Sequence, residues 1–407
     1  MNPTDSSFSR RTIIQAAAAA SVMATMGAAS AANRSGAPVR AYVGTYGPKG
    51  KGIYRFAVDA ASGRLTPEGL AAETPNASWF ELDAAQRFLY AVNEVADFNG
   101  GTTGSVSAFS INPADGALAL VNSVSSAGAG PAHLSLHPGG AHVLVANYGG
   151  GNVAVLPIRA DGGLSSASDV KNDVDACGAT PCAPGVDGAE KAPPGSFAFS
   201  DHDGPHAHMI ASDAAGRFVL VNDLGLDRTL VWRFDGQQGR LSQPRTVASS
   251  AGAGPRHFVF HPNGRWFYSI NEEASTLAFM RYDAATGTLS PQDEVQTLPA
   301  GFVGTNFASE VLMSPDGRVV YCVNRLHDSI ATFSIGVDGR PTWAGEEWTR
   351  GSYPRSCSLD PSGRFLYVCN QRSDNIAIFR VAGGGRLLFT GHYAAVGSPA
   401  MIGFSGG

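Results

Sequence analysis

One short pattern recurs along most of this chain and limits what it can fold into. Each copy holds a turn, an apolar strand-like run, and Asn or Asp seven residues after the turn glycine or its equivalent. The six copies occupy residues 86–93, 140–147, 216–223, 264–271, 317–324 and 363–370. Self-similarity at a spacing of about 50 residues predicts a repeat architecture built from one supersecondary unit.

A second apolar alternation follows the pattern, as in residues 152–157, 229–234 and 375–380, and leads to a Gly-x-Leu turn. Such alternation is typical of strands, so each unit is expected to hold four short antiparallel strands. One four-stranded sheet cannot bury both of its faces, whereas sheets packed around an axis share a continuous core. The repeats therefore predict an all-β propeller.

A seventh unit is split between the two ends of the repeat region. Residues 41–46 and 52–58 open it, and residues 397–404 end it. We therefore expect one seven-bladed domain over residues 40–407, with the ring closed by N- and C-terminal strands. The 50 Gly, 24 Pro and 15% charged residues agree, because they describe many short segments between turns. Stacked β-sandwiches, the alternative, require a domain boundary that the sequence does not show.

Residues 1–32 have the features of an export signal. Arg10 and Arg11 precede an Ala-rich apolar run, and Ala29-Ser30-Ala31 offers a cleavage site. These features are typical of a twin-arginine signal peptide, and a tail with a chance arginine pair is the alternative. No later apolar run reaches the length of a membrane span. We expect a periplasmic protein without a membrane segment after cleavage.

The charge of the chain argues against nucleic acid as a partner. The formal net charge is −5, and no Lys/Arg cluster is present that would neutralise a row of phosphates. A small molecule is the expected partner, and the oligomeric state stays open.

One repeat interval is longer than the others. The surplus, residues 165–203, is rich in Gly, Pro, Ala and Asp, and we expect an inserted surface loop. Cys177 and Cys182 lie in it and are able to close a small disulfide in an oxidising compartment. Cys322 and Cys369 lie in apolar strand-like runs, where a cysteine usually serves as a small core residue.

Blade position indicates where chemistry would be placed. The innermost strand of each propeller blade lines the axis, so residues at one repeat position converge. Eight residues before the repeat glycine the chain carries Ala132, His208, Arg256, Ser309 and Arg355. Two arginines and a histidine are unusual for a purely structural position.

The strand-end Asn or Asp and its successor form a second inward set. It includes Asn147, Asp223, Asn271, Glu272 and Arg325. An Asn at a strand end often only satisfies the turn backbone. Three arginines near Glu272 would keep it ionised and leave surplus positive charge for an anionic or oxyanion-forming ligand. Arg–Glu pairing between blades is the structural alternative.

His206 and His208 have the spacing that places two side chains on one side of an extended strand. They suit proton transfer or a metal, and His202 with Asp203 would extend a zinc set. No further ligand with fixed spacing is apparent. We therefore expect no metal and no other cofactor, and turn hydrogen bonding is the alternative for each histidine.

The ordered set of motifs resembles the lactonase family of seven-bladed propellers, which includes bacterial 6-phosphogluconolactonases and fungal carboxymuconate cyclases. The likeness covers about residues 40–404 and rests on Tyr42-Val-Gly-Thr-Tyr46, Gly204-Pro-His-Ala-His208, Gly254-Pro-Arg-His-Phe258, Asn271-Glu272, Ser309-Glu310 and Asn324-Arg325. The resemblance implies His208, Arg256 and Glu272 as catalytic residues. The inward positions make His206, Asn147, Asp223 and Asn271 the candidate substrate contacts. A further arginine is implied, and either Arg325 or Arg355 qualifies.

The resemblance implies lactone hydrolysis. His208 or Glu272 would act as general base for water, and arginines would stabilise the oxyanion. The reverse reaction, cycloisomerisation of a muconate-type acid, and a non-catalytic binding scaffold are the alternatives. An exported enzyme would not meet a phosphorylated cytoplasmic lactone, so a sugar-acid (aldono) lactone is the expected substrate.

Overall fold

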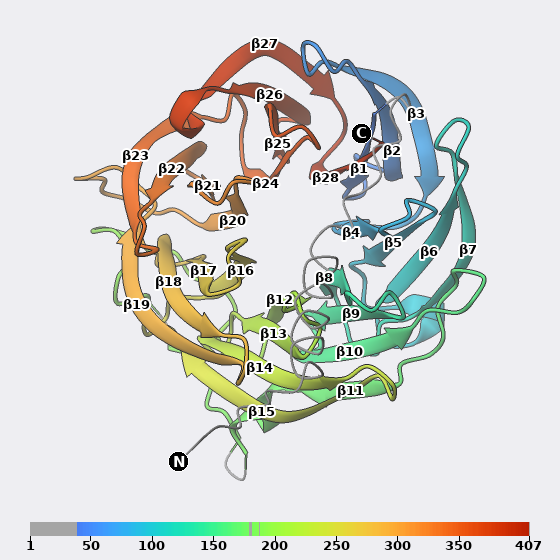
Figure 1. Cartoon of the computed structure of the whole chain (residues 1–407), viewed down its shortest axis with the longest axis horizontal. Helices are drawn as coiled ribbons and strands as arrows, with labels where there is room; N and C mark the ends of the chain where they lie inside the picture. Colours follow the sequence, from blue (N-terminus) through green and yellow to red (C-terminus); the bar gives the residue numbers. More distant parts are fainter. Residues whose placement is uncertain (1–38, 179–180, 187, 407) are drawn as a thin grey trace, which may run out of the picture. The chain divides into compact units, whose positions relative to one another are not determined.

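Seven four-stranded antiparallel sheets surround a central axis (Figure 1). The computed structural model describes residues 39–178, 181–186 and 188–406, and the expected signal peptide, residues 1–32, lies outside them. The innermost strands are β28, β4, β8, β12, β16, β20 and β24. This arrangement confirms the seven-bladed propeller expected from the repeats. Across the described residues, no helix is both long enough and apolar enough to traverse a bilayer.

The first four blades have the following strands, in order from the axis outward. Blade 1 consists of β28 (Pro399–Ser405), β1 (Arg40–Thr45), β2 (Gly52–Val58) and β3 (Leu65–Glu73). Blade 2 consists of β4 (Phe80–Leu82), β5 (Phe88–Asn93), β6 (Ser105–Ile111) and β7 (Leu118–Ser125), with η1 (Phe98–Gly100) after β5. Blade 3 consists of β8 (Pro131–Leu136), β9 (His142–Asn147), β10 (Asn152–Pro157) and β11 (Asp169–Asn172), followed by η2 (Asp173–Cys177). Blade 4 consists of β12 (Ala207–Ser212), β13 (Phe218–Asp223), β14 (Arg228–Asp235) and β15 (Arg240–Ala248).

The last three blades have the same order from the axis outward. Blade 5 consists of β16 (Pro255–Phe260), β17 (Trp266–Asn271), β18 (Thr276–Asp283) and β19 (Thr288–Gln296). Blade 6 consists of β20 (Ala308–Met313), β21 (Val319–Asn324), β22 (Ser329–Ile335) and β23 (Pro341–Trp348). Blade 7 consists of β24 (Pro354–Leu359), β25 (Phe365–Asn370), β26 (Asn375–Val381) and β27 (Leu387–Ala395), with η3 (Gly383–Gly385) before β27.

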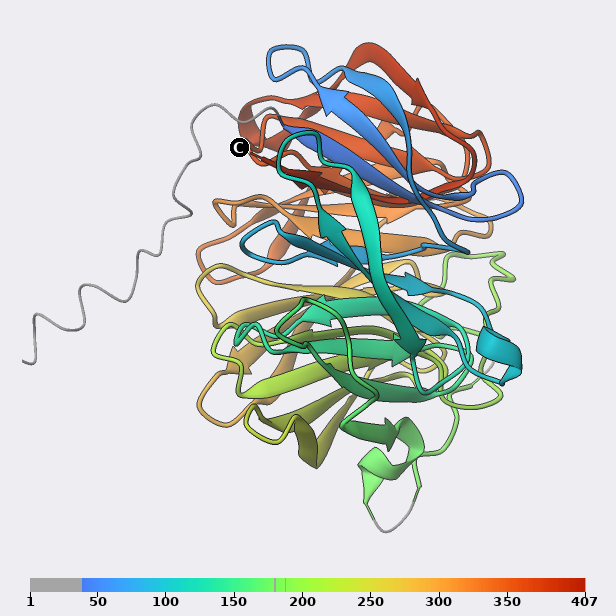
Figure 2. The same ribbon diagram turned by 90° about the vertical axis from the view of Figure 1, so that its right-hand side faces the viewer.

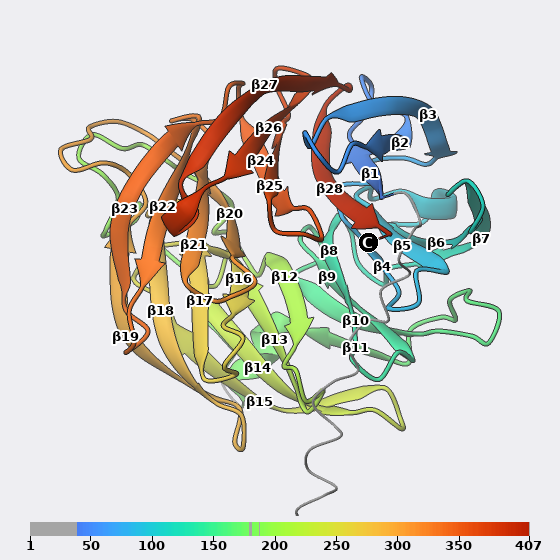
Figure 3. The same ribbon diagram turned by 45° about the horizontal axis from the view of Figure 1, so that its top comes forward.

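The ring closes as the split repeat predicts. β28 pairs antiparallel with β1, with Ala41 opposite Phe404 and Val43 opposite Ile402 (Figure 3). Val43 and Ile402 are fully buried, so the closing pair shares the core of the neighbouring strands.

A repeated tyrosine joins neighbouring blades. In five blades, a buried tyrosine of the second strand from the axis donates its hydroxyl to a glycine carbonyl of the next blade at 2.7–3.0 Å; the tyrosines are Tyr42, Tyr90, Tyr268, Tyr321 and Tyr367. Tyr367 reaches Gly63, which ties blade 7 to blade 1. Each accepting glycine has a positive φ, which is 75° at Gly63. Residues with a side chain rarely adopt this backbone conformation, so glycine is favoured there. The buried hydroxyls are thus satisfied across the blade interfaces.

A β-bulge recurs near the start of the innermost strands. The register shifts after Pro131, Ala207, Pro255, Ala308 and Pro354 in β8, β12, β16, β20 and β24. A bulge leaves residues unpaired and re-aims their side chains. The residues within or beside these bulges are those that the repeat position singled out, among them His208, Arg256 and Arg355.

Parts of the inserted segment, residues 165–203, form regular structure or are buried. Residues 169–172 form β11, the outermost strand of blade 3, and η2 follows at the outer edge of the ring (Figure 2). Cys177 and Cys182 form a disulfide there. His202, at the end of the segment, is buried. The expectation of a surface loop was therefore wrong for these parts, because a short fourth strand leaves little periodicity to recognise.

Candidate active site

A buried carboxylate with two arginines lies at the axis. Glu272 follows β17, Arg325 follows β21, and Arg256 lies at the bulge of β16. Arg325 Nη2 lies 2.5 Å and Arg256 Nε 3.0 Å from Glu272 Oε2. The Arg256 contact is an ion pair without hydrogen-bond geometry, and its Nε has no hydrogen-bond partner. Arg256 also donates to the Ser309 carbonyl.

The charges of this cluster determine its protonation. Burial alone would raise the pKa of Glu272, but Arg325 and Arg256 outweigh it and hold that pKa below its usual value. Burial and the neighbouring Arg325 and Arg355 lower the pKa of Arg256 to about 10, which still leaves it charged at neutral pH. Glu272 is therefore an ionised counter-ion in a site of low exposure.

The two candidate further arginines differ in how they are engaged. Besides Glu272, Arg325 contacts the Tyr353 hydroxyl at 3.3 Å and the backbone carbonyls of Phe307 and Ala308 at 3.5 and 3.4 Å. Arg355 has one ion pair, to Glu94 at 3.7 Å, and lies over the Tyr46 ring at 4.9 Å. Its side chain is 17% exposed against 6% for Arg325. Arg355 thus has more donors available for a ligand.

Three histidines lie together at the axis beside Arg256. The His257 ring centroid lies 5.0 Å from that of His208 and 5.4 Å from that of His133, and Trp79 packs on His257 at 5.2 Å. All three histidines are buried. Burial lowers the pKa of each well below its usual value, and the charge of Arg256 lowers it further. They are neutral imidazoles at physiological pH.

A second buried carboxyl contacts this histidine cluster. Glu310 Oε1 lies 3.0 Å from His257 Nδ1 and accepts the Val311 N–H at 3.1 Å. Burial raises the pKa of Glu310 to about 8, although Arg256 opposes the rise. His257 and Glu310 were not predicted from the repeat, because each follows the position that the repeat singles out. His257 directly follows Arg256, and Glu310 directly follows Ser309. The two residues therefore share one repeat position, and this was the signal available in the sequence.

The end of the inserted segment contacts the same carboxylates. Ser200 donates its hydroxyl to Glu272 Oε1 at 3.0 Å and its N–H to Glu273 Oε1 at 2.8 Å. His202 Nε2 lies 2.9 Å from Glu273 Oε1, and its Nδ1 lies 4.0 Å from Asp227 Oδ2. Burial opposes charge on His202, yet Glu273 and Asp227 raise its pKa above the usual value. Ser200 and His202 of the inserted segment therefore contact the carboxylates of the candidate site.

Two exposed carboxylates of this segment lie beside Tyr148 and His206. Asp201 accepts the Tyr148 hydroxyl at 3.0 Å, and Asp203 lies 2.8 Å from His206 Nε2. The rings of His206 and His208 both adjoin Tyr148, at 4.7 and 5.6 Å between centroids. His206 also contacts the Tyr148 carbonyl at 3.0 Å. The structure thus brings His206 and His208 together against Tyr148, although His206 precedes β12, which begins at Ala207.

The strand-end residues expected to bind substrate are engaged by neighbouring turns and strands. Asn147 donates to the Ser126 carbonyl, and Asn271 donates to Thr276 and Glu294. Asp223 accepts the N–H groups of His206 and Leu226. Asn147, Asp223 and Asn271 are at most 1% exposed, and among the described contacts none reaches the arginines. Their contacts match the turn-stabilising alternative, because a strand end leaves backbone groups that require partners.

The surplus positive charge expected at the axis is smaller than the sequence predicted. Arg256, Arg325 and Arg355 face two ionised carboxylates, Glu272 and Glu94, which leaves one formal positive charge while Glu310 is protonated. The prediction counted a single carboxylate there, although Glu94 follows β5 of blade 2 at the same repeat position that Glu272 holds in blade 5. The centre still favours an oxyanion, while Asp201 and Asp203 add exposed negative charge beside Tyr148 and His206.

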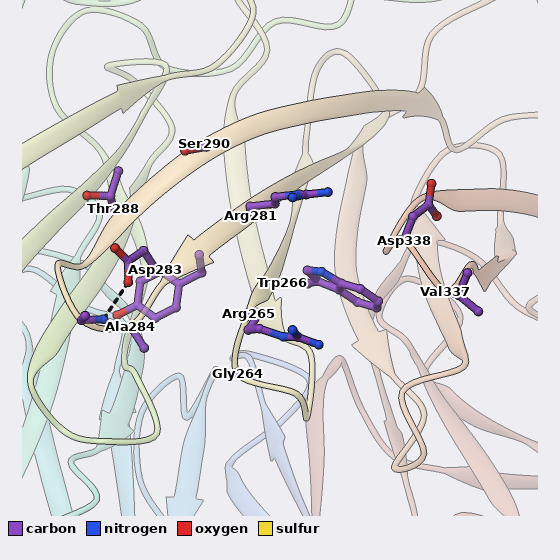
Figure 4. A pocket seen from close by; sticks show the side chains of 12 residues that line it. Gly264, Arg265, Trp266, Arg281, Asp283, Ala284, Thr288, Ser290, Val337 and Asp338 are labelled. Carbon is purple, nitrogen blue, oxygen red and sulfur yellow. Dashed lines mark hydrogen bonds between the residues drawn. The ribbon is translucent and has the colours of Figure 1, made fainter.

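Two other features bear on where chemistry takes place. Within residues 39–178, 181–186 and 188–406, no group of three or more His, Cys, Asp or Glu has the geometry to hold a metal ion. A groove of about 600 Å³ lies between blades 5 and 6 and is lined by Trp266, Arg281 and Asp338 among others (Figure 4). It lies at the start of β17, whereas Glu272 follows the end of that strand, and it contains none of the expected site residues.

Comparisons with known proteins agree with this architecture. The family model described as Lactonase, 7-bladed beta-propeller matches residues 40–404. A 6-phosphogluconolactonase of Bacillus subtilis is 30% identical over 321 residues, which span 78% of this chain and 84% of that protein. A periplasmic gluconolactonase of Pseudomonas aeruginosa has a TM-score of 0.78 and 29% identity over 90% of this chain and 98% of its own. A protein from Lactobacillus plantarum has a TM-score of 0.79 and 28% identity over 90% and 99% of the two chains. The chain therefore belongs to the lactonase family of seven-bladed β-propellers.

Proposed function

We propose that this protein opens an unphosphorylated sugar-acid (aldono) lactone by hydrolysis at the axial site. The observation that carries the proposal is the neutral, buried His208 beside an arginine cluster that retains one positive charge. A lactone needs a base to activate water and a cation to stabilise the tetrahedral oxyanion. His208 and the arginines supply both.

His208 is the better general base of the two candidates. Glu272 Oε2 is engaged by Arg325 and Arg256 and its Oε1 by Ser200, so its lone pairs are committed. His208 has no hydrogen bond to another described side chain, and burial keeps it neutral. Glu272 then orients Arg256 and Arg325.

Arg355 is the arginine best placed to contact the ligand. Its single ion pair, to Glu94 at 3.7 Å, leaves guanidinium donors free. Arg256 and Arg355 would share the charge of the oxyanion and then that of the carboxylate product. Arg325 is held by Glu272 and the backbone and serves as support.

Several observations favour a lactone without phosphate. The export signal expected in residues 1–32 would place the protein in the periplasm, and the Cys177–Cys182 disulfide suits an oxidising compartment. Asp201 and Asp203 beside Tyr148 and His206 would repel a phosphate dianion. The name of the Pseudomonas aeruginosa protein, a periplasmic gluconolactonase, agrees with this choice.

The proposal is tested by following glucono-δ-lactone opening with a pH indicator. The wild type is expected to exceed the spontaneous rate, and His208→Gln is expected to lower kcat at least 100-fold. His392→Gln, a histidine of the outer strand β27, is the matched control and should retain wild-type activity. A wild-type rate equal to the spontaneous one across a panel of aldonolactones would refute the proposal.

A further inference from the structure

Two buried residues outside the proposed mechanism form a dyad behind His208. Glu310 is 6% exposed and His257 is 3% exposed. Glu310 Oε1 lies 3.0 Å from His257 Nδ1. A carboxyl that holds one nitrogen of a histidine fixes the tautomer of the ring and leaves the other nitrogen for a second partner. The hydrolysis proposed for His208 and the arginines leaves this pair unused.

Hydrogen-bond satisfaction assigns the tautomer of His257. Glu310 Oε1 already accepts the Val311 N–H at 3.1 Å, so it acts as an acceptor. When Glu310 is ionised it can only accept, so His257 then donates from Nδ1 and its Nε2 carries a lone pair. That Nε2 is buried without a partner, and so is Nδ1 of His208. The two rings lie 5.0 Å apart between centroids at an angle of 66°.

We propose that Glu310 and His257 are positioning residues for His208. In this relay Glu310 Oε1 accepts a hydrogen bond from His257 Nδ1–H. His257 Nε2 in turn accepts a hydrogen bond from His208 Nδ1–H. His208 then presents the lone pair of Nε2 to water. The two unpartnered nitrogens are not hydrogen bonded to each other in this structure, and the contact closes on substrate binding, as catalytic contacts often do. The inference rests on the proposed function.

The proton balance is simple. Water loses one proton to His208 Nε2 as its oxygen bonds to the lactone carbonyl carbon. The imidazolium is stabilised through His257 by Glu310, because Glu272 is already paired with arginines. The same proton passes to the ring oxygen as its bond to the carbonyl carbon breaks, which restores neutral His208. The product is the open hydroxy acid, which ionises in water.

The surroundings set how the dyad titrates. Glu310 faces Arg256 of β16, Arg355 of β24, and the thiols of Cys322, Cys357 and Cys369. His257 faces Arg256, Arg355, Arg325, Glu272, His133 and His208. Since Glu310 titrates near pH 8, its ionised fraction rises tenfold per pH unit below that value. The enzymatic rate should rise with it once the spontaneous opening is subtracted.

Glu310→Gln is the informative variant, because it retains the acceptor oxygen and removes the charge. Its kcat on glucono-δ-lactone should fall 10- to 100-fold with KM changed less than threefold, and the rise between pH 6 and 8 should disappear. Glu81→Gln is the matched control, since Glu81 lies on the innermost strand β4, accepts the Leu136 N–H at 2.9 Å and has a pKa raised by burial to about 7. It should stay within twofold of wild type. A Glu310→Gln variant with wild-type kcat and pH profile would overturn the inference.

A second measurement separates this inference from the proposed function. Nitrogen-15 NMR of labelled protein with gluconate bound reports which ring nitrogen of each histidine carries the proton. His208 should carry it on Nδ1 in the wild type and distribute it over both nitrogens in His257→Phe. A wild-type His208 protonated on Nε2 would overturn the dyad even if the enzyme opens lactones. Absence of lactone opening with the expected tautomer would instead overturn the hydrolytic function.

Discussion

Arg325 Nη2 lies 2.5 Å from Glu272 Oε2, and this ion pair joins the ends of two strands in adjacent blades. The side chains are 6% and 10% exposed. Because Arg256 approaches the same oxygen, Glu272 holds two guanidinium groups at the axis. Loss of its charge would therefore leave two buried cations without a counter-ion.

Glu272→Gln should lower the free energy of unfolding by about 3 kcal/mol, because removing one member of a buried ion pair leaves its partners uncompensated. Urea unfolding measures the change. Glu347→Gln is the control, since Glu347 pairs with Arg350 nearer the surface, and it should change stability by less than about 1 kcal/mol. Equal stability of the two variants would show that the buried cluster does not depend on the Glu272 charge.

Tyr367→Phe tests the closure of the ring. The variant loses the hydroxyl that bonds the Gly63 carbonyl between blades 7 and 1, and leaves a buried carbonyl without its donor. We expect a loss of about 1–2 kcal/mol in unfolding free energy. Tyr393→Phe, an exposed tyrosine of β27, should have no measurable effect. Identical unfolding midpoints for both variants would contradict a role for the tyrosine contacts between blades.

Docking of the inserted segment should depend on pH through His202. Its pKa is raised in the folded protein by Glu273 and Asp227, so the stabilisation is complete below the unfolded value of about 6.5 and is lost as pH rises through the folded pKa. Proteolytic cleavage within residues 165–203 should therefore accelerate severalfold as pH rises above 6.5. His202→Gln should remove this dependence, and an unchanged pH dependence in that variant would assign it to another group.

The exposed Asp201 and Asp203 should discriminate against phosphate. Asp201→Asn with Asp203→Asn should raise kcat/KM for 6-phosphogluconolactone about tenfold relative to glucono-δ-lactone, because like-charge repulsion is removed. The control is Asp316→Asn with Asp338→Asn, which changes the net charge by the same amount. These residues lie in turns of blade 6 at the end away from Arg325, so the control should leave the ratio of the two kcat/KM values unchanged. High salt should raise the wild-type ratio and not that of the variant lacking the Asp201 and Asp203 charges. A ratio that shifts equally in both double variants would show an effect of net charge alone.

The repeat made the fold predictable, because six blades repeat one turn, usually with a glycine, and one strand-end Asn or Asp, as at Gly264 and Asn271. It also placed His208, Arg256 and Arg355, since residues at one repeat position converge on the axis. His257 and Glu310 were missed because the bulge, which exposes a second side chain per strand, depends on backbone pairing that the repeat does not reveal.

Contacts of the inserted segment could not be predicted, since Ser200 and Asp201 follow no repeat. Their positions depend on how residues 165–203 fold across the neighbouring blades. The charge at the axis was overestimated for a different reason, because Glu94 holds the same strand-end position as Glu272 but its charge was not counted against Arg355.

If the axial arginines stabilise the oxyanion during aldonolactone opening, loss of Arg355 should slow the reaction far more than loss of an arginine elsewhere. Steady-state opening of glucono-δ-lactone should be compared in the wild type, Arg355→Gln and Arg281→Gln, the last an arginine of the groove between blades 5 and 6. We predict that Arg355→Gln lowers kcat/KM at least 100-fold, on the order of 3 kcal/mol of transition-state stabilisation, while Arg281→Gln retains the wild-type value. Equal rates for Arg355→Gln and the wild type would contradict the account.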